Sequence, residues 1–156
     1  MQEDGTVNTC ALRSVCLPGQ KVHRRQLLTE LDAMADARAF LTRAESHLRR
    51  ARTAAPHPTD WYDLTIYGFY CLEAAVMAAA THAGLSVPPT HPGKRAAAEK
   101  LARDHALPDV SVLLPMLNAA RKAAAYGDTT LPPLDPVRLV RDLERYVAAV
   151  GQMISR

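Results

Sequence analysis

The chain has 156 residues, of which 48% are hydrophobic, and it carries a formal net charge of +3 at neutral pH. This length fits one domain that is large enough to bury a core. The small basic excess does not by itself identify a nucleic-acid-binding protein. The three cysteines are odd in number and lack metal-ligand spacing, which favours a reduced, intracellular chain over a disulfide-rich secreted one.

The N-terminal segment differs from the rest of the chain. Residues 1–21 mix Gly, Asn, Pro and charged residues without a period, so we expect a flexible tail followed by one helical domain over residues 22–156. Residues 1–20 also lack the continuous apolar stretch of a signal peptide, and the apolar run over residues 66–80 is interrupted by Gly68 and Glu73. A soluble, cytoplasmic protein without a membrane partner is the expectation.

Five segments have helical periodicity. A long amphipathic helix is predicted over residues 24–54, and a helix that is apolar nearly all round over residues 61–83. After a Pro-rich connection, a short helix is predicted over residues 95–106. The fourth helix ends at Tyr126 and begins either at Asp109, which could cap it, or at Pro115, which would bend an earlier start. Asp135 and Pro136 open the last helix, over residues 136–153.

The expected fold is therefore all-α, an antiparallel up-down bundle of four long helices plus one short helix. The helix over residues 61–83 should be the central one, because no side of it is polar. The predicted core consists of Ile66, Phe69, Leu72, Val76, Leu113, Leu117, Leu143 and Val147.

Two charged residues interrupt apolar stripes. On a helical wheel Arg121 falls among the leucines of the fourth helix, and Glu73 falls on the stripe of Ile66 and Phe69. A lone buried charge costs several kcal/mol, so the simplest arrangement is a pair of the two. Such a pair is either a structural ion pair between helices, or a cleft in which Glu73 orients Arg121 toward a phosphate.

Basic residues gather in two other places. Residues 43–52 hold four arginines and one histidine, and a second cluster includes Lys94 and Arg95. Such clusters are commonly solvated helix faces, and phosphate binding is the alternative. No pair of histidines has zinc-site spacing, and there is no Gly-rich phosphate loop or nucleophile motif, so neither a metal nor another cofactor is expected.

The order of a long helix, "YGFYCLEAAVMAAA", "THPGKRAAAEKLARDHALP" and "LNAARKAAAYGD" resembles the HEPN domain, the helical fold of many prokaryotic toxin and defence ribonucleases. The resemblance covers residues 24–155 and is greatest to small stand-alone bacterial members. It implies a homodimer whose motif helices meet in a shared cleft. There the 2′-hydroxyl of RNA attacks the adjacent phosphate without a metal, and an Arg and a His assist.

In this comparison Arg121 matches the motif arginine, but the residue five positions later is Tyr126 instead of histidine. Tyrosine keeps its proton near neutral pH and is a poor general base. The candidate catalytic residues are thus Arg121, Tyr126 and Glu73. The candidate RNA-binding residues are Asn118, Lys122, His91, Lys94 and Arg95, of which His91 could also substitute for the missing histidine because it opens the third helix beside two cations.

Three functions remain open on the sequence. The first is a HEPN-type RNA-binding protein from a toxin–antitoxin or defence system, which either binds RNA only or also cleaves it as a metal-independent endoribonuclease. The second is a non-catalytic HEPN module that binds a nucleotide or a partner, such as a minimal nucleotidyltransferase or an antitoxin. The third is a structural bundle in which Arg121 and Glu73 form a buried pair.

Overall fold

The computed structural model describes residues 18–127 and 134–156, with side chains described from residue 29 onward. These residues form five helices and no strand, which confirms the predicted all-α class. The helices are α1 (Pro18–Ala54), α2 (Trp61–His82), α3 (His91–His105), α4 (Leu113–Ala125) and α5 (Pro136–Ile154).

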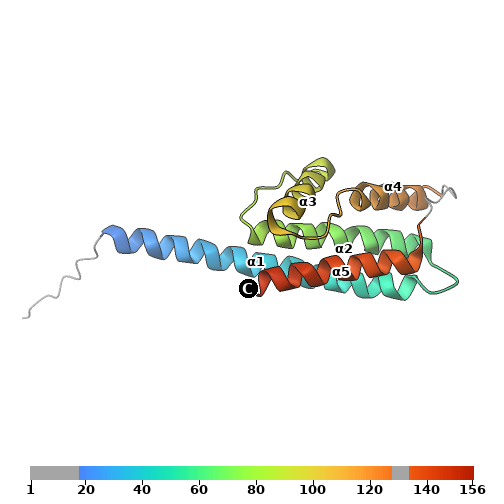
Figure 1. The fold of residues 1–156 in the computed structure, drawn as a ribbon, viewed down its shortest axis with the longest axis horizontal. Helices are drawn as coiled ribbons and strands as arrows, with labels where there is room; N and C mark the ends of the chain where they lie inside the picture. Colours follow the sequence, from blue (N-terminus) through green and yellow to red (C-terminus); the bar gives the residue numbers. More distant parts are fainter. Residues whose placement is uncertain (1–17, 128–133) are drawn as a thin grey trace, which may run out of the picture.

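Helix α2 is the centre of the molecule. It packs against each of the other four helices, with α1 and α5 along one side and α3 and α4 along the other (Figure 1). Its buried residues are mostly small: alanines, Gly68 and Cys71 allow the neighbouring helices to approach closely. The first turns of α1 extend beyond the other helices (Figure 1). The prediction that the helix over residues 61–83 is central is confirmed.

Three helix starts are fixed by side-chain caps. The side chains of Asp60, Thr90 and Asp135 accept hydrogen bonds from the backbone N–H groups of Asp63, Gly93 and Arg138, at 3.0, 3.2 and 2.9 Å. Each bond satisfies a first-turn donor that has no partner inside its helix. Two of these helices also have Pro in the first turn, where a missing N–H costs nothing.

Several helix bounds differ from the expected ones. Helix α1 begins at Pro18 and not at residue 24, so only residues 1–17 of the predicted tail remain, and these lie outside the described residues. Helix α3 begins at His91, because Thr90 and not a later residue supplies the cap. Helix α4 begins at Leu113. Asp109 does not cap it, because its carboxylate accepts from the backbone N–H of Ser111 at 2.9 Å.

The predicted core is confirmed at six of its eight positions. Ile66 and Leu113 are only half-buried. Ile66 shares one face of α2 with Tyr62 and Tyr70, which are exposed, so this face is partly open. Leu113 lines a groove between α4 and α5.

Helix α2 is long and apolar enough to cross a membrane, by length and composition alone. However, 67% of its apolar window is buried against the rest of the fold, as in the core helix of a water-soluble domain. Cys71 lies on this helix as a free, buried thiol, and burial raises its pKa to about 12, so it stays protonated. Cys10 and Cys16 lie outside the described residues.

Candidate functional site

The guanidinium of Arg121 lies against two aromatic rings of α2. Its Cζ is 4.8 Å from the centre of the Phe69 ring and 5.9 Å from that of Tyr70. Its Nη2 donates a hydrogen bond to Oδ1 of Asn118, one turn earlier on α4, at 2.8 Å. Its Nε is buried and has no hydrogen-bond partner among the described residues. The wheel position of Arg121 on an apolar stripe is thus explained by stacking on rings, which suits the weakly hydrated guanidinium.

The predicted pair of Arg121 with Glu73 is wrong. Glu73 Oε1 accepts a hydrogen bond from Lys94 Nζ at 2.8 Å and lies 3.1 Å from His91 Nδ1. Its side chain is 15% exposed and that of Lys94 is 20% exposed. The first turn of α3 passes over α2 at the level of Glu73, so the ammonium of Lys94 reaches the carboxylate and neutralises it. No carboxylate of the described residues lies within ion-pair distance of Arg121.

His91 connects this ion pair with the Arg121 site. Its ring meets that of Phe69 edge-on, with the centres 5.4 Å apart. His91, Arg95 and Asn118 also line one small cavity of about 190 Å³ between α2, α3 and α4. Four of the eight predicted site residues therefore lie around Phe69 or this cavity. They are Arg121, Asn118, His91 and Arg95.

The other predicted site residues are exposed or are already bonded to a neighbouring side chain. Tyr126 is 87% exposed at the end of α4, so it is not a buried catalytic group. Lys122 is exposed on α4. Lys94 is held by Glu73. Arg95 lines the cavity, but its Nε already donates to Glu99 Oε1 at 3.2 Å. No group of three or more His, Cys, Asp or Glu side chains in residues 29–127 and 134–156 is arranged to hold a metal ion.

Sequence reasoning missed the aromatic surroundings of the site. His47 is the histidine of the basic cluster over residues 43–52, and its ring packs against Tyr67 and Tyr70, at centre distances of 6.0 and 5.6 Å. The guanidinium of Arg50 lies over the Tyr67 ring at 4.9 Å and donates to its hydroxyl at 2.7 Å. The signal available in the sequence was the spacing of three between Tyr67 and Tyr70, which places both rings on neighbouring parts of one helix face.

The environment of His47 lowers the pKa of its imidazole below the ordinary value of 6.5. Burial is the main cause, and the nearby positive charges of Arg50 and Arg43 add to it. Because the unfolded chain then binds a proton more readily than the folded one, the stability that neutral His47 contributes is complete above pH 6.5. It is lost as the pH falls through the folded pKa.

We therefore expect the free energy of unfolding to decrease between pH 7.5 and pH 5.5, and to decrease less in His47→Gln. Urea denaturation at both pH values measures this difference. His105→Gln is the control, because His105 is exposed at the end of α3. An equal reduction of the pH dependence in both variants would contradict the assignment to His47.

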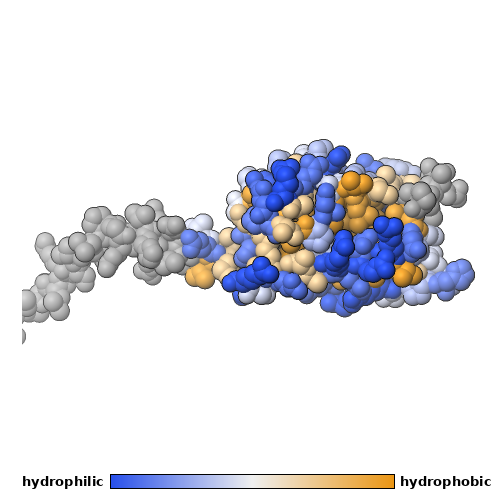
Figure 2. Space-filling model, viewed as in Figure 1, coloured by the Kyte–Doolittle hydropathy of each residue, from blue (hydrophilic) through white to orange (hydrophobic). Residues whose placement is uncertain are grey.

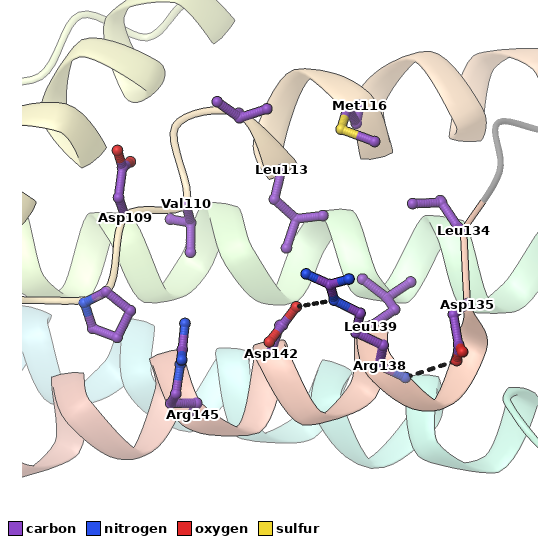
Figure 3. A pocket seen from close by; sticks show the side chains of 12 residues that line it. Asp109, Val110, Leu113, Met116, Leu134, Asp135, Arg138, Leu139, Asp142 and Arg145 are labelled. Atoms are coloured by element: carbon purple, nitrogen blue, oxygen red, sulfur yellow. Dashed lines mark hydrogen bonds and ion pairs between the residues drawn. The ribbon is translucent and has the colours of Figure 1, made fainter.

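A second feature is an open groove of about 430 Å³ between α4 and α5. Figure 3 shows Leu113 pointing from α4 toward α5, where Leu139 lies, with Met116 further along α4 and Arg138 and Asp142 along the α5 rim. Arg138 Nε and Asp142 Oδ2 are 3.8 Å apart. Apolar surface is also visible between charged residues in this region of Figure 2. The groove is separate from the residues that surround Arg121.

Comparisons of the chain with models of protein families, with curated proteins and with solved structures each found no significant match.

Proposed function

We propose that the chain is a HEPN-type RNA-binding protein whose RNA phosphate is held by Arg121. The observation that carries the proposal is a guanidinium that is stacked on two rings and tethered by Asn118, without a neutralising carboxylate among the described residues. An arginine fixed in this way presents its remaining N–H donors to an anion at little entropic cost.

The surroundings of Arg121 favour RNA over a simple anion. Tyr70 beside it is 38% exposed, and its ring is available to a base. His91 and Asn118 line the neighbouring cavity and offer polar groups to a phosphate or a sugar hydroxyl. Glu73 is neutralised by Lys94, so it repels the backbone of an RNA less than a free carboxylate would.

We further propose that the helices form an antiparallel up-down bundle, as expected for such a domain. The active form is then a cytoplasmic homodimer with α4 near the interface. Small residues on α4 support this, since Ala119 and Ala125 are exposed and Ala123 and Ala124 are half-buried. Ala120 is buried in the core and belongs to the monomer.

The proposed function is the binding of RNA and does not include its cleavage. Tyr126 stands where the ribonucleases of the family carry histidine, and its side chain is 87% exposed, outside any enclosed site. Tyrosine is a poor general base near neutral pH.

The test is a binding and cleavage assay with purified protein and labelled RNA in EDTA. Arg121→Ala is expected to weaken binding at least tenfold, because both the charge and the forked donor set are lost, and Arg121→Lys is expected to be intermediate. Arg141→Ala is the matched control, since it removes one exposed arginine of α5. Equal weakening in the two alanine variants would show only diffuse attraction. The same incubation shows whether the wild type cuts RNA without a metal.

A second candidate function is that of a non-catalytic interaction module for a protein partner, such as a nucleotidyltransferase or an antitoxin. The groove between α4 and α5 favours it, because Val112 and Met116 expose apolar surface at its edge while Asp142 and Arg145 lie on its other side. Apolar surface ringed by charge is typical of protein interfaces.

A further inference from the structure

The contacts around Arg121 continue along α1 and α2 as a connected series of rings and guanidinium groups. We call this series the aromatic row. Its members in spatial order are Arg50, Tyr67, His47, Tyr70, Arg121 and Phe69.

Each step in the aromatic row is a contact between flat groups. His47 and Tyr67 are stacked with 22° between their planes, and His47 and Tyr70 are tilted by 44°. The guanidinium of Arg50 lies 4.9 Å from the centre of the Tyr67 ring, and that of Arg121 lies 5.9 Å from the centre of the Tyr70 ring. Arginine and aromatic side chains are the groups on which unpaired bases stack in nucleic-acid-binding proteins.

Phe69, at one end of the row, is buried in the core, but the other members reach the surface. Tyr70 and Arg50 are exposed, and Tyr67 and His47 are half-buried. A cavity of about 160 Å³ opens beside the rings of His47 and Tyr70, and Arg43 lines it as well. A base can therefore approach these rings without the displacement of a core side chain.

The charge along the row is positive. Arg43, Arg50 and Arg121 have no carboxylate within ion-pair distance among the described residues, whereas Arg52 on the same helix α1 is bonded to Glu144 at 2.6 Å. Positive groups that alternate with rings attract the phosphates of a strand while its bases stack. Tyr67 and Tyr70 are three residues apart, a rise of about 4.5 Å along a helix, so successive nucleotides could use them.

We propose that the aromatic row is the path of single-stranded RNA through the site, with a phosphate at Arg121 and the next bases on Tyr70 and toward Tyr67. This inference rests on the proposed RNA binding at Arg121 and specifies single-stranded RNA as the ligand. A duplex should bind poorly, because its bases are stacked on one another and cannot reach the rings.

The test uses fluorescence anisotropy with a labelled 12-nucleotide oligouridylate in EDTA. Tyr70→Ala is expected to weaken binding on the order of tenfold, the loss of one stacked base. Tyr62→Ala is the matched control, because Tyr62 is an exposed tyrosine on the same helix, 52% exposed, and outside the row. Tyr70→Leu keeps apolar packing and should lose nearly as much affinity, which separates stacking from a folding defect.

Two further measurements make the result specific. An abasic strand of the same length should bind wild type and Tyr70→Ala equally, because it has phosphates but no bases to stack. Arg50→Gln should weaken oligouridylate binding more than Arg49→Gln, since both arginines are exposed on α1 but only Arg50 covers a ring of the row.

The outcomes separate the two proposals. If Tyr70→Ala binds like Tyr62→Ala, or if a duplex binds as well as the single strand, the path along the row is wrong. If the wild type does not bind RNA, or Arg121→Ala binds like wild type, the proposed function itself is wrong.

Discussion

Phe69→Ala is expected to lower the free energy of unfolding by about 3–5 kcal/mol, as large-to-small changes at buried aromatic positions do. Phe69 is only 1% exposed and is the common neighbour of Arg121, His91 and Tyr70. Removal of the ring leaves a cavity at the junction of α2, α3 and α4, and it also takes away the surface on which the guanidinium rests. Urea denaturation followed by circular dichroism measures the change.

Phe69→Leu separates packing from ring chemistry. Leucine fills most of the space, so we expect a loss of only about 1–2 kcal/mol. It has no ring for Arg121 to stack on, so RNA binding should still weaken in a variant that remains folded. A cost below about 1 kcal/mol for Phe69→Ala would mean that the ring is not part of the core.

Leu143→Ala is expected to destabilise the fold by about 2–5 kcal/mol. Leu143 is fully buried on α5, and Leu117 on α4 is fully buried as well. Both leucines meet α2 at Gly68, where an added Cβ would lie 3.6 Å from Leu143 Cδ1 and 3.7 Å from Leu117 Cδ1. The shortened side chain would leave a cavity at this crossing, and thermal or urea unfolding measures the cost.

The control for Leu143→Ala is Val137→Ala, on the same helix but 74% exposed, which should change stability by less than about 0.5 kcal/mol.

Gly68→Ala tests the same helix crossing from the α2 side. Its methyl group would make ordinary contacts, and alanine is the better helix former, so the variant should be neutral or stabilising by up to about 1 kcal/mol. A large loss of stability in Gly68→Ala would contradict the contacts of α2 with Leu143 and Leu117 at this position.

Local sequence determined most of the secondary structure. The cap residues Asp60 and Asp135 act on backbone groups three positions away, so their effect is readable from the sequence itself. Periodicity also identified α2 as the central helix and placed Arg121 and Glu73 on mostly apolar faces. The start of α4 was harder to predict, because Asp109 can cap a helix or bond within its own turn, and only the path of the chain decides between the two.

Tertiary structure decided the partners of the site residues. Glu73 and Arg121 both needed a partner, but a helical wheel contains no information on which helix crosses above which. Glu73 bonds with His91 and Lys94, 18 and 21 residues later, because the connection before α3 brings the first turn of that helix over α2. His47 likewise meets Tyr67 and Tyr70 only because α1 packs along α2. Interactions within one turn follow from the order of residues, whereas contacts between helices depend on how all the apolar faces pack together at once.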